Sequence, residues 1–156
     1  MDKKIINKIQ KRVIRLLPIK RQNKPGILLA DSCSEVSRLV ADWIKKIDES
    51  SHILILKGVN VCNTQKAHDV LAVITTDNQV YIIDPTIWQF FPREKSIFVS
   101  IVSDIDIALD EIKIRYGGQW SESEEFIKMD KDEEKKYLDI ISQNISENLE
   151  SENQRF

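Results

Sequence analysis

The sequence has few cysteines and no long run of apolar residues. Cys33 and Cys62 are too few for a disulfide scaffold, and together with only two histidines they do not fall at metal-ligand spacings. No metal or other cofactor is therefore predicted. No apolar run is long enough to cross a bilayer, and the N-terminal residues lack the apolar core and cleavage site of a secretory signal. A free reactive thiol also requires reducing surroundings. We therefore expect a cytoplasmic protein, which acts either in the producing cell or inside a target cell.

A large net charge is also absent. The formal charge is −2, so nothing in the overall composition indicates a nucleic-acid binder. The charge is nevertheless unevenly spread, because residues 1–25 contain nine Lys or Arg against Asp2 alone, whereas residues 121–156 contain eleven acidic and five basic residues. The two ends of the chain therefore carry opposite charge.

Length and composition predict one domain. The 156 residues, 42% of them hydrophobic, are enough for a single core and too few for two. We expect this domain to cover residues 1–147, with its central part at 30–103 and a disordered acidic tail at 148–156. The predicted fold is α+β, with one helix packed on an antiparallel sheet of about four strands and further helices at both ends.

Apolar residues at helical spacing, Ile9 and Val13 among them, predict an N-terminal helix within residues 1–17 that ends before Pro18. Lys and Arg fill most of its other positions. One interpretation is a helix that packs on the core and exposes a basic face. The other is an interfacial helix that binds an anionic membrane or an acidic partner.

Further apolar patterns predict the remaining elements. They favour a helix from Cys33 to about Ile47, a buried strand over His52–Val59, a strand over 96–102, a helix over Asp104–Tyr116 that ends at Gly117, and a helix around 133–145. Trp43 is expected to be a core anchor that holds the first of these helices rigidly against the sheet.

The stretch Ala67–Phe91 predicts a β-hairpin with an ionisable residue at each end. Two apolar runs flank a turn at residues 77–79; His68 begins the first run and Asp84 ends the second. These ends face each other in an antiparallel pair with a short turn, so His68 and Asp84 are expected to be neighbours. A carboxylate beside an imidazole fixes its tautomer and supports its positive form, as in a nucleophile-base-orienter triad.

Cys33 is the predicted nucleophile of that triad. Ser32 and Glu35 have the spacing of a capping box, which places Cys33 in the first turn of a helix. Unpaired backbone N–H groups and the positive end of the helix dipole favour a thiolate there. Cys33, His68 and Asp84 are therefore the candidate catalytic residues of a thiol enzyme.

The order Cys33, His68, Asp84, and the spacing from His68 to the Asp84-Pro85-Thr86 sequence, resemble the transglutaminase-like and papain-like superfamily of Cys-His-Asp enzymes. The resemblance covers about 30–91, and the small size is similar to that of bacterial papain-fold toxins and effector glutamine deamidases. Transglutaminases usually have an aromatic residue soon after the histidine, where this chain has Asp69, and papain-type peptidases have Gly and Trp around the cysteine. These differences leave the place within the superfamily open.

Four other residues are weighed against this triad. His52 is a rival base, but His68 is preferred because no carboxylate is correspondingly placed for His52. Cys62 is a rival nucleophile, but no capped helix follows it. The resemblance implies a side-chain amide upstream of the cysteine that helps to hold an oxyanion, and Gln22 is the candidate. Trp88, just after Asp84, is expected either to wall the substrate cleft or to close the core.

The sequence thus predicts a cysteine-dependent hydrolase of carboxamide bonds in a protein substrate. The resemblance favours glutamine deamidation, followed by peptide hydrolysis and then by amine transfer as a transglutaminase or acyltransferase. A non-catalytic binding module on the same fold remains an alternative.

Overall fold

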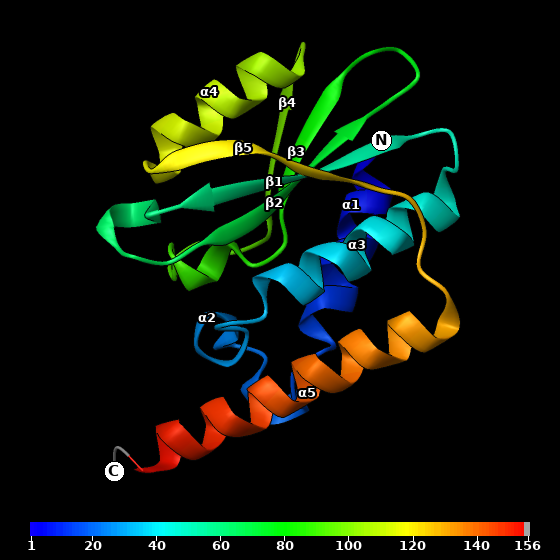
Figure 1. Cartoon of the computed structure of the whole chain (residues 1–156). Coiled ribbons are helices and arrows are strands. Elements are labelled where there is room, and N and C mark those ends of the chain that lie inside the picture. Colours follow the sequence, from blue (N-terminus) through cyan, green and yellow to red (C-terminus); the bar gives the residue numbers. More distant parts are fainter. Residues whose placement is uncertain (155–156) are drawn as a thin grey trace. The chain divides into compact units, whose positions relative to one another are not determined.

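The structure is a computed structural model that describes residues 1–154, and it is an α+β protein (Figure 1). Its helices are α1 (Lys3–Ile14), α2 (Pro25–Leu28), α3 (Cys33–Ile47), α4 (Ile105–Tyr116) and α5 (Lys131–Gln154). Its strands are β1 (His52–Val59), β2 (His68–Ile74), β3 (Val80–Asp84), β4 (Phe98–Val102) and β5 (Gln119–Phe126). Short 3-10 turns follow at η1 (Ile19–Arg21), η2 (Val61–Asn63) and η3 (Ile87–Gln89). Among the described residues, no helix has the length and apolar character needed to cross a membrane.

The chain gathers into two compact units. Unit 1 consists of Met1–Val40, Pro85–Ile97 and the chain from Met129 onward, and it is helical apart from its loops. Unit 2 consists of Ala41–Asp84 and Phe98–Lys128, and it holds all five strands, α4 and the second half of α3. The single-domain assignment stays a prediction.

The sheet of unit 2 has the order β4-β3-β2-β1-β5, and every neighbouring pair is antiparallel. β2 and β3 are central and almost wholly buried, as expected of near-continuous apolar runs. α4 packs on the sheet through contacts with β3, β4 and β5 (Figure 1). The sheet has five strands instead of the expected four or so, because Gln119–Phe126 pairs with β1 as an edge strand.

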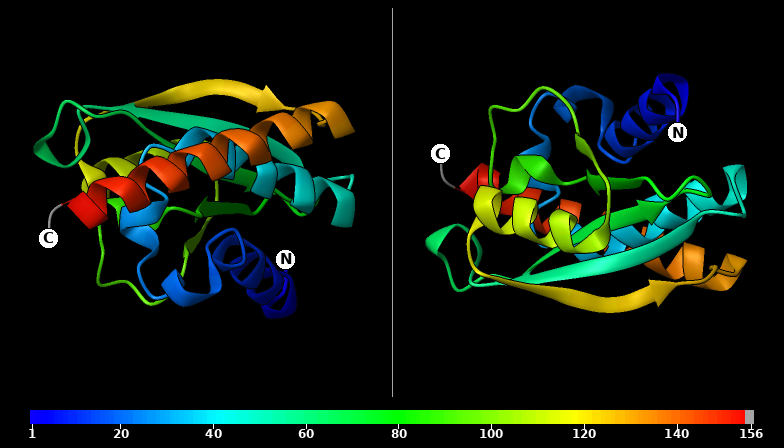
Figure 2. Two further views of the ribbon diagram at one scale, coloured as in Figure 1. Left: turned by 90° about the horizontal axis from the view of Figure 1, so that it is seen from below. Right: turned by 90° about the horizontal axis from the view of Figure 1, so that it is seen from above.

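The helices of unit 1 bury apolar side chains, and hydrogen bonds from α5 hold the segment around α2. α1 buries Ile9 and Val13, and α2 contacts both η3 and α5. Figure 2 shows α5 running past α2. The side-chain amide of Asn148 on α5 donates to the backbone carbonyls of Leu28 and Ala30, at 3.2 and 3.1 Å. Residues 148–154, expected to be disordered, are helical; residues 155 and 156 of the predicted tail lie outside the described residues.

Other expected elements are observed with small changes at their ends. α3 begins at Cys33 and ends at Ile47, and β1 has the predicted bounds. Trp43 is buried, as expected of a core anchor. α4 begins after Asp104, whose carboxylate caps the helix by accepting a bond from the Ile107 N–H at 2.9 Å. It ends at Gly117, which has a positive φ of 67°.

Candidate functional site: a buried His-Asp pair at the ends of two strands

His68 and Asp84 are brought together in unit 2, as the hairpin predicted. His68 begins β2, Asp84 ends β3, and the His68 Nε2 atom lies 2.7 Å from Asp84 Oδ2. The two residues are not directly opposite. Leu71 pairs with Ile83, so continuing this register puts Val70 opposite Asp84. His68 therefore reaches Asp84 diagonally, along the face that all three share.

Both side chains of the pair are fully buried, with 0% exposure. A carboxylate only accepts hydrogen bonds, so the His68 Nε2–H donates to Asp84 and the neutral ring then has its lone pair on Nδ1. Asp84 thus fixes one imidazole tautomer. Nδ1 is the atom at which such a ring takes up a proton.

Tyr116 adds a second donor to the same carboxylate oxygen. It is the last residue of α4, it is buried, and its hydroxyl donates to Asp84 Oδ2. Burial and then the negative charge of Asp84 raise the pKa of Tyr116 far above its usual value, so the phenol stays protonated and able to donate. Its ring also lies 5.5 Å from that of His68, between centroids. Asp84 is therefore held from two elements, β2 and α4.

Trp120 covers the histidine from the edge of the sheet. Gly58 on β1 pairs with His68 on one side and with Trp120 of β5 on the other. A Cβ atom at Gly58 would lie 2.5 Å from the Trp120 ring, so only glycine leaves room for the indole. The Trp120 ring meets the His68 ring edge-on, with centroids 6.4 Å apart and planes at 88°. Because Gly58 has no side chain, the Trp120 ring can occupy this position beside His68.

Cys62 is the thiol of unit 2. It lies in η2, between β1 and β2, with a left-handed backbone at φ 51°. Burial, followed by the charge of Asp84, raises the pKa of the Cys62 thiol. A raised pKa disfavours the thiolate, so this environment does not activate Cys62 as a nucleophile.

Cys33 begins α3 in unit 1, and its side chain is partly exposed. The carbonyl of Ser32 accepts the first helical bond, from the Val36 N–H at 2.9 Å, so Ser32 has the predicted N-cap position. The Ser32 hydroxyl accepts from the side-chain amide of Asn144 on α5, at 3.0 Å. Cys33 therefore has the predicted place in a first helical turn. The complete triad joins residues of both units and stays a prediction.

Gln22 and Trp88 line one pocket of unit 1, together with Ile14, Asn23, Pro25, Pro92, Glu94 and Lys95. The Gln22 amide donates to the backbone carbonyl of Leu17 at 3.4 Å. Trp88 is 3% exposed and its indole N–H donates to the Glu94 carbonyl at 2.8 Å. Trp88 therefore belongs to the core and also lines a pocket. The oxyanion role of Gln22 stays a prediction.

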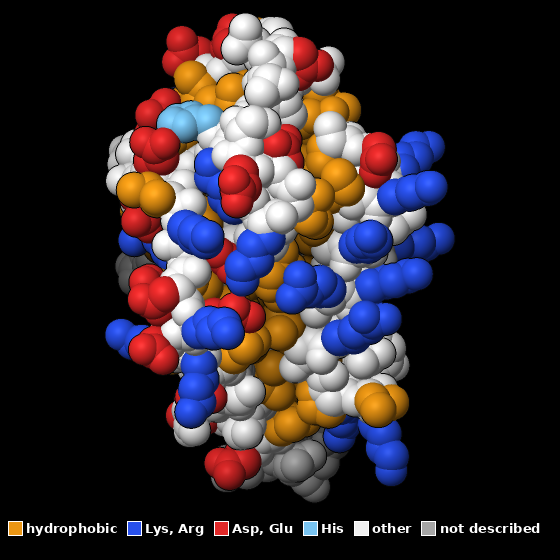
Figure 3. Space-filling model, turned by 90° about the vertical axis from the view of Figure 1, so that its right-hand side faces the viewer, with side chains coloured by type: hydrophobic (Ala, Val, Ile, Leu, Met, Phe, Trp, Pro, Cys, Tyr) orange, Lys and Arg blue, Asp and Glu red, His pale blue; other side chains and the backbone are white. Residues whose placement is uncertain are grey.

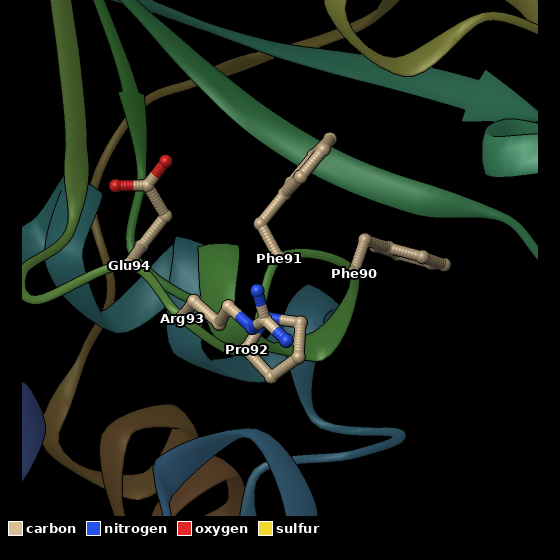
Figure 4. Close-up of a pocket in the computed structure, with 5 residues that line it drawn as sticks. All are labelled: Phe90, Phe91, Pro92, Arg93 and Glu94. Carbon is tan, nitrogen blue, oxygen red and sulfur yellow. The ribbon is translucent and has the colours of Figure 1, made fainter.

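A second hollow of unit 1 lies in the loop after η3. It is lined by Phe90, Phe91, Pro92, Arg93 and Glu94, and Figure 4 shows the two phenylalanine rings projecting on the same side of the loop. The loop follows Asp84 by only a few residues. Its lining combines three apolar side chains with the charged Arg93 and Glu94.

His52, the rival base, has a carboxylate partner after all. Its Nδ1 atom lies 2.8 Å from Glu125 Oε1, and both side chains are about half exposed. The reason given for preferring His68 is thus wrong, because β5 was not foreseen as the neighbour of β1. The preference itself now depends on burial, since only the His68 pair is removed from solvent.

The chain matches no protein-family model, no curated protein and no solved structure.

Three residues of the site were not foreseen as part of it: Tyr116, Trp120 and Gly58. Tyr116 was expected only as the last residue of its helix, and Trp120 was given no role. Gly58 gave a usable signal, since an isolated glycine within a strand marks a close approach by another group. Nothing in the sequence indicates which ring approaches it.

Proposed function

We propose that this protein is a thiol hydrolase that cleaves carboxamide bonds in a protein substrate, with Cys33, His68 and Asp84 as its catalytic residues. The observation that carries the proposal is the buried bond from His68 Nε2 to Asp84, supported by Tyr116. A histidine held in this way by a carboxylate has the arrangement of the base and the orienter in a triad. Cys33 begins α3, at the position in a first helical turn that is expected of the nucleophile.

The proposed reaction has two steps. His68 takes the thiol proton, and the Cys33 sulfur attacks the carbonyl carbon of the carboxamide. The C–N bond breaks, the nitrogen takes the proton from the imidazolium and leaves, and a thioester remains on Cys33. Water, deprotonated by His68, then attacks the thioester, releasing the carboxylic acid and restoring the thiol. Asp84 accepts the Nε2–H bond throughout and stabilises the imidazolium.

The bond that is cleaved determines the activity. Our first choice is hydrolysis of a glutamine side-chain amide, which releases ammonia. The second is hydrolysis of a peptide bond, which releases a new N-terminal amine. A transglutaminase reaction, in which an amine replaces water, is the third. All three use the same thioester, and a reducing compartment such as the cytoplasm would keep the thiol available.

The experiment is intact-protein mass spectrometry of candidate substrate proteins incubated with the wild-type protein. A gain of about one dalton per site indicates deamidation, fragments indicate proteolysis, and amine-bearing or cross-linked species indicate transfer. Each product should be lost with Cys33→Ala and retained with Cys62→Ala, the matched control. Equal product from Cys33→Ala would reject Cys33 as the nucleophile.

One observation favours a second candidate, a non-catalytic module that binds a partner. His68 and Asp84 are both fully buried, and such a pair with Tyr116 also serves to fix the core of a sheet. In that case neither thiol needs a reactive state. The reactivity of Cys33 distinguishes the two candidates.

A further inference from the structure

The exposed side of α1 is a continuous basic stripe. At 3.6 residues per turn, Lys4, Lys8, Lys11 and Arg15 lie along one line of the helix, and all four are exposed. The buried residues Ile9, Val13 and Leu17 recur along the opposite side. Figure 3 shows Lys and Arg side chains gathered along the right-hand margin of the face that it presents. One side of α1 is thus buried, and its basic side is exposed.

Acidic residues do not neutralise this basic stripe. Asp2 is the one acidic residue among residues 1–25, and its carboxylate is used as the N-cap, accepting from the Ile5 N–H at 3.0 Å. Among residues 1–154, none of the four stripe side chains forms a salt bridge. Lys3 and Arg12 are exposed on either flank of the stripe. The helix therefore offers a strong positive field to an anionic surface.

An exposed apolar side chain follows the basic stripe in the sequence, just after the end of α1. Ile19 of η1 is 89% exposed, and the exposed Lys20 follows it. An isolated apolar residue beside bases is suited to the boundary between lipid headgroups and acyl chains. Residues 1–24 contain no Phe, Trp or Tyr. Aromatics are the usual stacking groups for single-stranded nucleic acids and the usual anchors of protein interfaces, so both of those partners fit less well.

From this arrangement we propose that the α1 basic stripe, with Ile19, binds the surface of a membrane that contains anionic lipids. Binding is peripheral, because Ile9, Val13 and Leu17 stay within unit 1 and only Ile19 enters the interface. Long-range attraction by the bases supplies most of the affinity, which must therefore fall as salt screens the charges. The proposal does not depend on the enzymatic function.

Co-sedimentation with lipid vesicles tests it on the full-length protein. The protein should pellet with phosphatidylcholine vesicles that contain phosphatidylserine and remain in solution with phosphatidylcholine alone, and high salt should release it. The triple variant Lys4→Gln/Lys8→Gln/Lys11→Gln should lower the partition coefficient at least about tenfold. Gln has a helix propensity close to that of Lys, and these positions are exposed, so the variant is expected to fold.

The matched control removes three exposed bases from α5, as Lys131→Gln/Lys135→Gln/Lys136→Gln, and should keep most of the binding. Ile19→Ser provides a second test that leaves the charge intact, and it should weaken binding several-fold. Equal loss in the α1 and α5 variants, or equal pelleting with both kinds of vesicle, would overturn the proposal. So would the absence of pelleting at low salt, or tighter binding to polyglutamate or single-stranded RNA than to the vesicles.

Discussion

At the scale of single residues, Asp84 determines the geometry of the site. One of its oxygens accepts bonds from both His68 and Tyr116, and the Asp84 side chain is fully buried. Burying a carboxylate is costly unless it is well hydrogen-bonded, so each donor matters more here than it would at the surface. Tyr116 therefore holds Asp84 in the position from which Asp84 orients His68.

Tyr116→Phe should lower the free energy of unfolding by about 2 kcal/mol, because it leaves a buried carboxylate with one donor fewer. The measurement is urea denaturation monitored by circular dichroism. Tyr137→Phe on α5, a half-buried tyrosine, is the matched control and should change stability by less than about 0.5 kcal/mol. Equal effects of the two substitutions would contradict the role given to Tyr116.

Gly58→Ala should destabilise the protein by about 1–3 kcal/mol, because the new Cβ atom meets the Trp120 ring. The measurement is a double-mutant cycle with Trp120→Leu, which removes the large ring. The two changes should be non-additive, with Gly58→Ala costing much less when residue 120 is Leu. If the cost of Gly58→Ala is unchanged in that background, the clash is not its cause.

At the scale of elements, β5 shows where prediction from sequence failed. Its sequence, QWSESEEF, consists largely of Glu and Ser, which do not favour strands, and most of its side chains are exposed. Pairing with β1 outweighs these preferences, and the register shifts between Ile55 and Leu56, as in a β-bulge. An acidic edge strand of this kind also discourages pairing with other chains.

The last turns of α5 are ordered by contacts that the sequence pattern does not reveal. Asn148 provides hydrogen bonds, and Glu152 adds ion pairs: its Oε1 atom lies 3.5 Å from Arg21 Nη1 and 3.3 Å from Lys24 Nζ. The acidic composition that predicted disorder thus provides partners for the basic N-terminal segment. The opposite charges of the two ends are visible in the sequence, but the identity of the side chains that pair is not.

Asn148→Ala should lower the free energy of unfolding by about 1–2 kcal/mol, because the carbonyls of Leu28 and Ala30 both lose a donor. Hydrogen exchange should also become faster in α2 and in the last turns of α5. Asn7→Ala, on the exposed part of α1, is the control and should have little effect. If the amide hydrogens in the last turns of α5 exchange as fast in the wild type as in the variant, Asn148 does not anchor them.

At the scale of the whole molecule, the sequence predicted elements best where strong apolar patterns are bounded by capping, turn or polar residues. α3, β1 and the hairpin of His68 and Asp84 meet that condition, and so their positions could be predicted. Trp120 and Tyr116 could not be assigned to the site, because they approach His68 and Asp84 from elements distant in sequence. The α+β class and the His-Asp pair were thus predictable, whereas the strand count and the support of the pair depend on tertiary contacts.

The reactivity of the two thiols with iodoacetamide across a range of pH, resolved by peptide mass mapping, tests the central claim most directly. Cys62 is an internal reference, because its pKa is raised and it should react only at high pH. A Cys33 thiolate supported by His68 should react well below that pH, and His68→Gln should abolish this low-pH reaction while His52→Gln leaves it intact. If Cys33 reacts only in the pH range of Cys62, or if His68→Gln leaves a folded protein with unchanged Cys33 reactivity, then the claim that His68 and Asp84 serve Cys33 is wrong.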